Sequence, residues 1–340
     1  MTLPKLKGLM RIHQKYLIDG NGGIIMMDDR KEPLVSVIMN CFNGEKYLKE
    51  AIDSVYAQTY KNWEIIFWDN ASTDRSAEIA LSYDNRLRYF RGDETIPLGA
   101  ARKKALEQSS GELIAFLDCD DVWLPEKLEK QVETMFDCKY ALCYAGIINI
   151  DQFGNKIGTY IPKYRSGNLF PQLLKQFDIN IPTAMIRKSV LLESKLSFDE
   201  NIFASEEYCL FMQLAVSYEF HIIPFPLAKY RIHENALSNK SIKNWADERE
   251  YTLNLIQKNN PGIRRKYSTG FREAYARARY YRARFYALNG KKANAMRELS
   301  KNIFIDARYL ALLFLLLMPL PLWNKTHNIH SKRKIFNIIE

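Results

Sequence analysis

The sequence predicts an α/β protein that is built around a parallel β-sheet and continues into a helical C-terminal region. Patterns of buried strands alternate with amphipathic helix patterns from residue 34 onward, which is the order expected of βαβ units. Two acidic clusters, beginning at Asp69 and Asp118, each follow such a strand directly. Because ligands of open parallel sheets bind beyond the carboxyl ends of the strands, the clusters predict a binding site at that edge.

The strands and helices of this sheet can be assigned in chain order. Apolar runs predict four strands, which cover Leu34–Met39, Trp63–Trp68, Leu87–Phe90 and Leu113–Leu117. Apolar residues that recur at three- and four-residue steps predict a helix ending near Ala80 and two further helices, Tyr47–Tyr56 and Ala100–Gln108. A proline at position 125 suits the first turn of another helix, and the turn residues 151–155 predict a hairpin.

Composition divides the chain into three regions. Residues 1–33 alternate basic, apolar and Gly-rich pieces, and we expect them to form an arm attached to a main domain over residues 34–240. Residues 240–340 carry 21 Lys and Arg against 7 Asp and Glu, whereas residues 1–239 carry 28 against 32. This asymmetry points to an anionic partner for the C-terminal region 241–340. Its sequence predicts a hairpin of two helices, Phe271–Leu288 and Lys291–Ile305.

An uncharged, Leu-rich segment runs from Tyr309 to Asn324. It is shorter than the roughly 20 residues that a membrane-spanning helix needs, and prolines 319 and 321 interrupt it. Basic residues on both sides favour a helix that lies in the interface of an anionic membrane surface. A buried core helix is the alternative. No recognised nucleic-acid-binding module accompanies the positive charge, so we do not expect nucleic acid as a partner.

The cysteines and the N-terminal residues indicate in which cellular compartment the protein is expected. The chain has five cysteines without zinc-like spacing, Cys41, Cys119, Cys138, Cys143 and Cys209. No apolar stretch of signal-peptide length follows the basic N-terminal residues. We therefore expect reduced thiols in a cytoplasmic protein.

Three carboxylates lie within four residues at the end of the strand that starts at Leu113. Asp118, Asp120 and Asp121 repel one another unless a cation or hydrogen-bond donors offset their charges. The pair Asp118-x-Asp120 suits a hard divalent cation that bridges to phosphate oxygens. Asp121 has the simpler alternative role of capping the next helix. Arg102, which follows a glycine in the first turn of a helix, is placed to bind phosphate or to hold the acidic cluster.

Several sequence blocks resemble the family 2 glycosyltransferases. The first block is Leu34-Val35-Ser36-Val37-Ile38 with Asn43-Gly44 and Tyr47-Leu48. The others follow in the expected order, as Asp69-Asn70-x-Ser72-x-Asp74, Gly99-Ala100-Ala101-Arg102, Asp118-x-Asp120-Asp121-x-Trp123-Leu124-Pro125 and Tyr230-Arg231-x-His233-x-Asn235. The match covers roughly residues 34–240, and several blocks in register are far more specific than one acidic triplet.

The resemblance implies an A-type nucleotide-sugar transferase fold. In this fold a Rossmann-like, mostly parallel sheet binds a nucleoside diphosphate sugar together with Mn²⁺ or Mg²⁺. UDP is the expected nucleotide, with dTDP or GDP as alternatives. The implied donor-binding residues are Asn40, Cys41, Phe42, Asn43, Asp69, Asn70, Arg102, Asp118, Cys119, Asp120 and Arg231. Asp120 and His233 are the implied metal-binding residues.

The catalytic residues that the resemblance implies are Glu206 and Glu207. The family usually has Glu-Asp here, ahead of an amphipathic helix, and the second acid acts as general base. In this chain the second acid is Glu207, one methylene longer, so both residues remain candidates for accepting the hydroxyl proton. Attack from the face opposite the diphosphate would invert the configuration. Residues 180–188 resemble the segment that supports the acceptor, and a buried strand is their alternative reading.

We therefore expect a metal-dependent, inverting glycosyltransferase on the cytoplasmic, inner face of the cell membrane. It would pass a sugar to a hydroxyl of a glycan acceptor carried on a lipid, in bacterial surface polysaccharide synthesis. One alternative is a catalytically silent scaffold of the same fold, whose basic C-terminal region binds membrane or partner proteins. Another is a nucleotidyltransferase that shares the acidic metal site.

Overall fold

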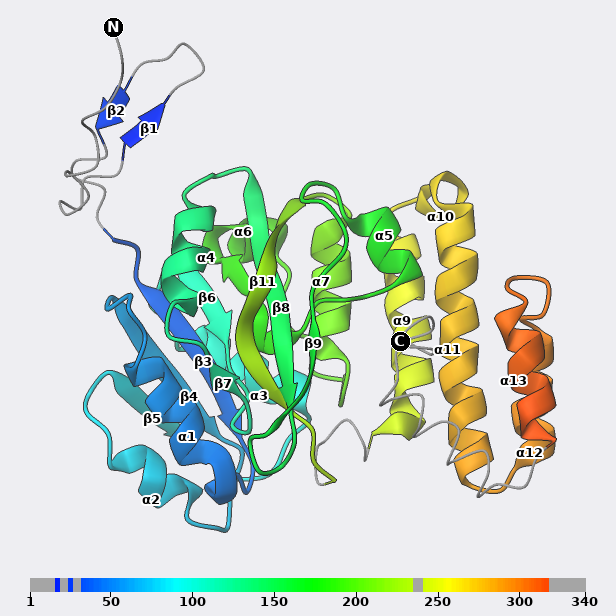
Figure 1. Cartoon of the computed structure of the whole chain (residues 1–340), viewed down its shortest axis with the longest axis horizontal. Coiled ribbons are helices and arrows are strands. Elements are labelled where there is room, and N and C mark those ends of the chain that lie inside the picture. The colour runs from blue at the N-terminus through cyan, green and yellow to red at the C-terminus, as the bar shows by residue number, and fades with distance from the viewer. Residues whose placement is uncertain (1–15, 19–23, 27–31, 235–240, 318–340) are drawn as a thin grey trace, which may run out of the picture. The chain divides into compact units, whose positions relative to one another are not determined.

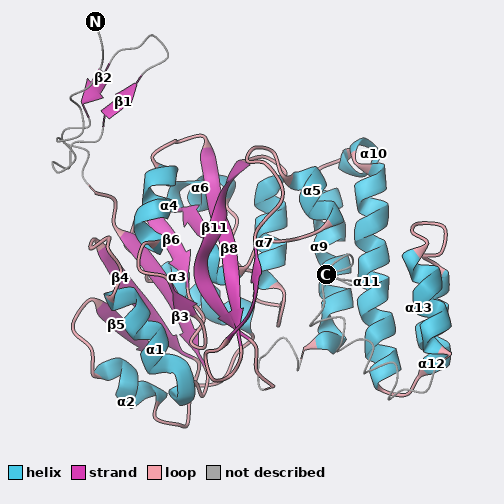
Figure 2. Cartoon of the chain, viewed as in Figure 1, coloured by secondary structure: helices cyan, strands magenta, loops and turns pink. Residues whose placement is uncertain are grey.

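The computed structural model describes residues 16–18, 24–26, 32–234 and 241–317. The chain separates into two compact units, Met1–Pro33 and Leu34–Glu340. In the first unit, strand β1 (Tyr16–Ile18) pairs antiparallel with strand β2 (Ile24–Met26). The second unit contains all the other described elements, and Figures 1 and 2 show a sheet with helices on both faces.

The first half of the main sheet is parallel, as the sequence predicts. Its strand order is β5-β4-β3-β6, with bounds Leu87–Arg91, Trp63–Asp69, Val35–Cys41 and Leu113–Phe116. Every residue of β3 and β4 is buried, which explains why most of their residues are apolar. The connecting helices are α1 (Glu45–Tyr56), α2 (Ser76–Leu81) and α3 (Leu98–Glu107).

The second half of the sheet adds antiparallel pairing. Strand β10 (Met185–Arg187) runs antiparallel between β6 and β8 (Tyr140–Ile150). Strand β8 then pairs in parallel with β11 (Glu219–Arg231), which carries β7 (Val122–Trp123) on its other side. The predicted hairpin is confirmed, because β9 (Lys156–Tyr160) returns antiparallel along β8. The α/β fold class with a C-terminal helical extension is likewise confirmed.

The remaining helices of this half are short. They are α4 (Lys127–Met135), α5 (Phe170–Lys175), the 3₁₀ turn η1 (Ile181–Thr183), α6 (Lys188–Ser194) and α7 (Glu206–Ala215). Residues 180–188 are thus a 3₁₀ turn followed by a short strand and the start of a helix.

Helix α3 begins earlier than the sequence pattern predicts. The pattern predicts a start at Ala100, but Pro97 is the N-cap and Leu98 and Gly99 form the first helical turn. The glycine is needed there because an added Cβ would lie 2.1 Å from the carbonyl oxygen of Asp199. The first turn of α3 therefore packs tightly on the loop that precedes α7.

The C-terminal extension is helical, with elements α9 (Ile242–Asn259), α10 (Ile263–Lys266), α11 (Ser268–Leu288), α12 (Lys292–Ser300) and α13 (Arg308–Leu316). Helix α11 matches its predicted range closely, whereas α12 ends five residues before the predicted Ile305. Leu253 of α9 and Phe271 of α11 belong to the same hydrophobic core as helices α5 and α7. The extension is therefore packed onto the main domain, as Figure 1 shows.

Helix α13 buries one face and exposes another apolar face. Tyr309, Leu312 and Leu316 pack in a separate core with α11 and α12. Leu310, Phe314 and Leu317 are 46%, 63% and 64% exposed. Residues 318–324 of the predicted apolar segment lie outside the described residues. In the described part of the chain, no helix has the length and hydropathy required to cross a membrane.

Candidate active site

A cavity of about 720 Å³ lies at the carboxyl ends of β3 and β6, where the sequence predicts a binding site. Its walls come from the end of β3, the start of α1, the acidic loop after β6, helix α3, the start of α7 and the end of β11. Most of the expected site residues line it, namely Asn40, Cys41, Phe42, Asn43, Asn70, Arg102, Asp118, Cys119, Asp120, Glu206, Glu207 and His233. Segments that are far apart in sequence thus meet at one cavity.

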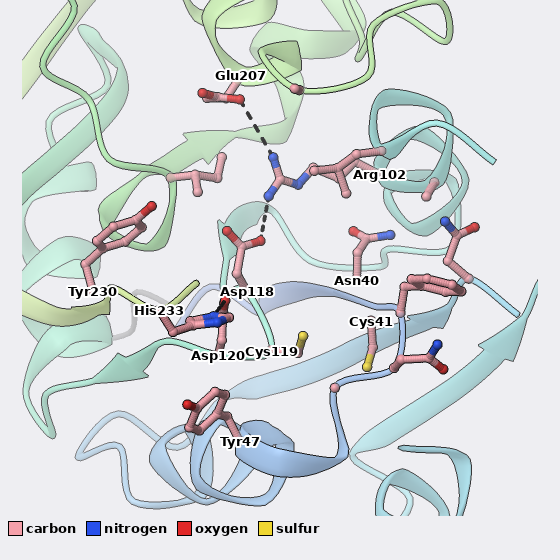
Figure 3. A pocket seen from close by; sticks show the side chains of 18 of the residues that line it. Asn40, Cys41, Tyr47, Arg102, Asp118, Cys119, Asp120, Glu207, Tyr230 and His233 are labelled. Carbon is pink, nitrogen blue, oxygen red and sulfur yellow. Dashed lines mark hydrogen bonds and ion pairs between the residues drawn. The ribbon is translucent and has the colours of Figure 1, made fainter. Parts of the chain in front are cut away.

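Arg102 connects the acidic loop to the N-terminus of α7. The side chain is buried, and its Nη2 donates to Asp118 Oδ1 at 2.5 Å. Its Nη1 donates to Glu206 Oε1 and lies 4.0 Å from Glu207 Oε2. Figure 3 shows the guanidinium between Asp118 and Glu207. One cation therefore lies among three carboxylates, one from the acidic loop and two from the first turn of α7.

The two candidate bases differ in their exposure. Glu206 is 1% exposed, and within the described residues its second carboxylate oxygen has no hydrogen-bond partner. The side chain of Glu207 is 24% exposed and reaches into the cavity. Burial raises the pKa of Glu207, and the nearby charge of Arg102 opposes that rise. Glu207 is the more accessible proton acceptor of the pair.

Asp120 and His233 meet on the floor of the cavity. His233 Nε2 lies 2.8 Å from Asp120 Oδ2, and the His233 and Tyr47 ring centroids are 5.3 Å apart. Burial, followed by the charge of Asp118, raises the pKa of the Asp120 carboxyl. A cation would relieve this repulsion. A carboxylate and an imidazole also suit a hard divalent ion that takes its other ligands from phosphate and water.

A metal ion at this position would need phosphate or water as additional ligands. Among the described residues there is no group of three or more His, Cys, Asp and Glu side chains arranged to hold a metal. Asp118 is paired with Arg102, which leaves Asp120 and His233 as the candidate protein ligands. The residues present therefore fit a cation that is held jointly with a bound diphosphate.

Asp121 and Arg231 connect the acidic loop to β11. Asp121 is buried, does not cap α4, and accepts a hydrogen bond from the backbone N–H of Arg231 at 2.8 Å. The Arg231 guanidinium is 2% exposed and donates to the carbonyl oxygen of Asp120 and to Glu50 Oε2. Arg231 is not among the residues that line the cavity. Its contacts fix the position of the acidic loop.

The turn after β3 presents polar and aromatic groups to the cavity. Asn40 is 8% exposed, and among the described residues neither atom of its amide has a hydrogen-bond partner. Phe42 is 52% exposed at the cavity wall. Asn43 has a positive φ of 52°, and its side-chain oxygen accepts from the backbone N–H of Thr73 at 2.8 Å. A buried, unsatisfied amide beside an exposed ring is typical of a ligand subsite.

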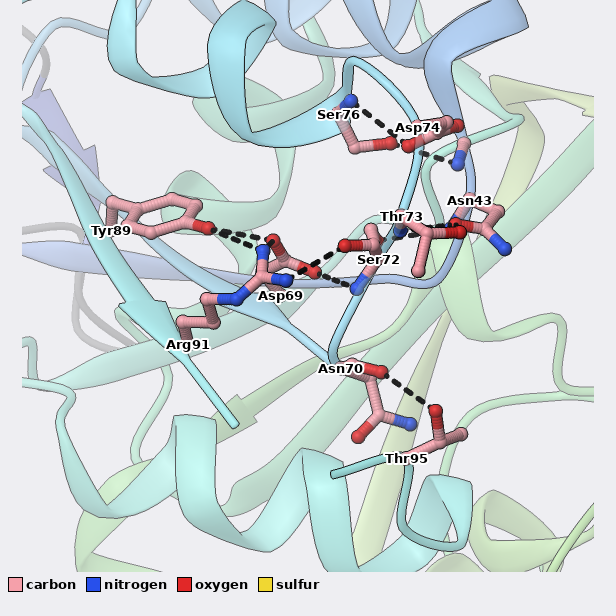
Figure 4. A network of polar contacts seen from close by, with 11 residues as sticks. Asn43, Asp69, Asn70, Ser72, Thr73, Asp74, Ser76, Tyr89, Arg91 and Thr95 are labelled. Atoms are coloured by element: carbon pink, nitrogen blue, oxygen red, sulfur yellow. Dashed lines mark hydrogen bonds and ion pairs between the residues drawn. The ribbon is translucent and has the colours of Figure 1, made fainter. Parts of the chain in front are cut away.

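Asp69 lies behind this turn and does not line the cavity. Its carboxylate is fully buried and accepts hydrogen bonds from Tyr89 at 2.6 Å, Arg91 at 2.7 Å and the backbone N–H of Ser72 at 2.7 Å. Figure 4 shows these partners around it. The next residue, Asn70, lines the cavity and donates to the carbonyl oxygen of Ile96 at 2.8 Å. Asp69 therefore organises the loop from which Asn70 faces the cavity.

The structure also adds cavity residues that the motifs do not indicate, among them Lys46, Gln152, Ile179 and Glu234. Glu248 of α9 supports the site from outside the cavity. Its carboxylate accepts from the backbone N–H of Phe203 at 2.9 Å and from the Ser205 hydroxyl at 2.7 Å. Helix α9 carries no motif, so only the tertiary contact identifies this residue.

Known proteins with similar sequences are glycosyltransferases. A family profile described as "Glycosyl transferase family 2" matches residues 36–194. An uncharacterized glycosyltransferase of Methanocaldococcus jannaschii is 35% identical over 244 residues, covering 69% of this chain and 83% of the relative. WfgD of Escherichia coli is 30% identical over 220 residues, covering 64% of this chain and 83% of the relative. That protein is named UDP-Glc:alpha-D-GlcNAc-diphosphoundecaprenol beta-1,3-glucosyltransferase.

Solved structures with the same fold are also glycosyltransferases. TarS 1–349 of S. aureus in complex with UDP-GlcNAc superposes with a TM-score of 0.62 at 18% identity, covering 83% of this chain and 84% of that one. The mannosyltransferase PcManGT of Pyrobaculum calidifontis, in complex with GDP-Man and Mn²⁺, gives a TM-score of 0.59 at 16% identity. That match covers 89% of this chain and 85% of the other. At these identities the likeness concerns the fold.

Proposed function

The chain belongs to glycosyl transferase family 2, and from this premise we propose that it transfers a sugar from a nucleoside diphosphate sugar to a hydroxyl of a glycan acceptor, with inversion. The observation that carries the proposal is the cavity itself. It combines an unsatisfied amide at Asn40, an acidic pair at Asp118 and Asp120, and a partly exposed carboxylate at Glu207.

The donor nucleotide is proposed to bind along the end of β3. The Asn40 amide offers both a donor and an acceptor, and the exposed Phe42 ring offers a face for a base. UDP is the nucleotide we favour, because the WfgD name specifies UDP-Glc and the TarS complex contains UDP-GlcNAc. Asn70 and Cys41 complete this wall of the cavity.

Mn²⁺ or Mg²⁺ is proposed to bind at Asp120 and His233. When bound, such a cation stabilises the negative charge that develops on a departing diphosphate. The PcManGT complex with Mn²⁺ provides a precedent in this fold. Arg231 and Asp121 would act indirectly, since their hydrogen bonds hold the acidic loop in place.

Glu207 is proposed as the general base. Its side chain faces the cavity at the N-terminus of α7, opposite the acidic loop, where an acceptor hydroxyl can approach it. Glu206 is instead the buried counter-ion of Arg102. Because Arg102 donates to both Asp118 and Glu206, it fixes the position of the Asp118 loop relative to the start of α7. Attack on the anomeric carbon from the side of Glu207 would invert its configuration.

The acceptor is proposed to be carried on a lipid diphosphate, as in the substrate that the WfgD name specifies. The protein would then act in surface polysaccharide synthesis, at the inner, cytoplasmic face of the cell membrane. The exposed face of α13, formed by Leu310, Phe314 and Leu317, is proposed to lie on the anionic membrane surface. The excess of Lys and Arg in residues 240–340 supports this orientation.

A thermal-shift panel tests the proposal. UDP, dTDP, GDP and CDP are each added with Mn²⁺, Mg²⁺ or chelator to wild type, Asp120→Ala and the exposed control Asp137→Asn. A ligand that binds only the folded state stabilises it by about 2.7 kcal/mol at a hundredfold excess over its Kd. We expect one diphosphate to stabilise wild type and Asp137→Asn only when metal is present, and to lose this effect in Asp120→Ala.

Two other outcomes would contradict the proposal. Absence of stabilisation by every diphosphate would favour a silent scaffold that uses the fold without its chemistry. Release of pyrophosphate from a nucleoside triphosphate would favour a nucleotidyltransferase.

A further inference from the structure

Two cysteines follow the paired part of adjacent strands: Cys41 is the last residue of β3, and Cys119 lies in the turn after β6. The parallel register pairs Ile38 of β3 with Phe116 of β6, and the N–H of Leu117 donates to the Ile38 carbonyl oxygen at 3.1 Å. Three residues further along each chain segment stand Cys41 and Cys119. Neighbouring strands lie about 4.8 Å apart, and disulfides join Cα atoms that are about 4.4–6.8 Å apart. The strand spacing where Ile38 and Phe116 pair therefore falls within the range that a disulfide can join.

The two sulfur atoms lie over the same glycine. A Cβ built on Gly44 would lie 2.7 Å from Cys41 Sγ and 2.9 Å from Cys119 Sγ. Both cysteines line the cavity, and Figure 3 shows their side chains near one another. Cys41 is 2% exposed and Cys119 is partly exposed. The absence of a side chain at Gly44 leaves the space that both sulfur atoms occupy.

We propose that Cys41 and Cys119 are an oxidative modification site, at which a peroxide converts the two thiols into a disulfide that weakens donor binding. The proposed disulfide bond is based on the positions of the two sulfur atoms beside Gly44. Its effect on donor binding rests on the function proposed for the same cavity.

The chemistry balances with a peroxide as the oxidant. The Cys41 sulfur attacks one peroxide oxygen, the O–O bond breaks, and a sulfenic acid and water form. The Cys119 sulfur then attacks the sulfur of the sulfenic acid, and the S–S bond forms as the S–O bond breaks. The departing hydroxide takes the Cys119 proton and leaves as water. Two thiols are oxidised, and one hydrogen peroxide is reduced to two waters.

A disulfide here would constrain the groups that contact the donor. Cys41 stands between Asn40 and Phe42, and Cys119 stands between Asp118 and Asp120. A bridge would tie the turn after β3 to the acidic loop, on the floor of the cavity. The acidic loop could then no longer adjust to a cation and a diphosphate.

Peptide mapping tests the bond itself. The full-length protein is titrated with hydrogen peroxide, alkylated, digested with trypsin without reduction and analysed by mass spectrometry. Cleavage after Lys31, Lys46, Lys104 and Lys127 puts the two cysteines on separate peptides, 32–46 and 105–127. We expect these peptides to be linked after peroxide and separate after dithiothreitol. The exposed Cys138 provides the control, because Cys138→Ser should give the same linked pair.

Nucleotide binding tests the effect. Oxidised wild type should lose most of the thermal shift caused by UDP with Mn²⁺, and dithiothreitol should restore it. Cys41→Ala and Cys119→Ala, each compared with its own untreated sample, should keep their shifts after peroxide.

The outcomes separate the two proposals. Absence of the linked peptides overturns the modification site, whatever the protein binds. Linked peptides with an unchanged UDP shift overturn the effect on donor binding. If reduced wild type shows no shift with any diphosphate, the proposed function fails, and the link between oxidation and donor binding fails with it.

Discussion

Arg102 contacts the two adjacent glutamates differently. Its guanidinium pairs with Glu206, which is buried, and leaves Glu207 partly exposed at 4.0 Å. The sequence allowed either residue to be the base, because both stand at the start of the same helix. Burial of one and exposure of the other distinguishes them.

Replacing Glu207, the proposed base, should therefore affect the chemical step. Glu207→Gln should lower kcat by about 10²- to 10⁴-fold, because a positioned general base contributes that much, while UDP binding stays near wild type. Steady-state kinetics and the thermal-shift panel measure the two effects. Glu200→Gln, on the exposed loop before α7, is the matched control and should keep wild-type kcat. Equal kcat values for the two variants would remove Glu207 from the catalytic role.

Asp178 should make folding stability depend on pH. Burial raises the pKa of its carboxyl to about 6, although hydrogen bonds from Tyr144 and Tyr160 oppose the rise. A pKa raised by folding means that the stabilisation is fully present below the unfolded value of 3.8 and is lost as pH rises through about 6. The change amounts to at most about 3 kcal/mol.

The variant Asp178→Asn cannot titrate at this position. Thermal unfolding of wild type and Asp178→Asn between pH 4 and pH 7 measures the difference. The variant should gain stability relative to wild type as pH rises through this window. Parallel pH profiles for the two proteins would show that the carboxyl titrates normally in the folded state.

At the level of elements, the contact between α3 and the loop before α7 sets the distance between Arg102 and the glutamates. The N–H of Gly99 donates to the carbonyl oxygen of Ile202 at 3.2 Å. A Cβ at Gly99 would lie 2.1 Å from the Asp199 oxygen and 3.0 Å from the Ile202 oxygen. These are backbone atoms, which cannot rotate away as the end of a side chain can.

Gly99→Ala should consequently destabilise the protein by about 1–3 kcal/mol, the usual cost of overpacking. It should also lower kcat, since the displaced loop leads directly to Glu206 and Glu207. Chemical denaturation and steady-state kinetics measure both effects. Gly158→Ala is the control, because its Cβ would meet no heavy atom closer than 3.9 Å. Equal stability of the Gly99→Ala and Gly158→Ala variants would contradict the tight packing.

At the level of the whole molecule, the C-terminal helices help to build the active site. Glu248 of α9 binds the backbone of Phe203 and Ala204 and the hydroxyl of Ser205, immediately before α7. Glu248→Ala should lower kcat more than it weakens UDP binding, because the loop before the base loses its anchor while the donor wall remains. Asp247→Asn, whose side chain is 76% exposed, is the neighbouring control. A matching loss of donor affinity would indicate general misfolding instead.

The exposed face of α13 should govern membrane binding. Changing Leu310, Phe314 and Leu317 together to Gln should reduce co-sedimentation with anionic vesicles, because these side chains supply apolar contact area. Deletion of residues 306–340 should abolish it. Leu192→Gln, 69% exposed on α6, controls for loss of one surface leucine. Undiminished sedimentation of the deletion protein would refute anchoring by this region.

The sequence by itself determined the local elements and the location of the site. Strands β3, β4 and β6 are buried on both faces, so most of their residues are apolar, and the acidic residues at their ends marked the carboxyl edge of the sheet. Most of the expected site residues line one cavity. Local periodicity and short motifs suffice for these features because their causes are local.

Only the tertiary structure decided which side chains meet. Arg102 and Glu206 are 104 residues apart, and Ser205 and Glu248 are 43 apart. Asp69 and Arg231 belong to family motifs, yet neither lines the cavity. Asp69 accepts hydrogen bonds from Tyr89 and Arg91, and Arg231 donates to Glu50. Residue type and spacing indicate which ligands a side chain is able to bind. Its exposure and partners follow from packing between distant segments, which no local pattern contains.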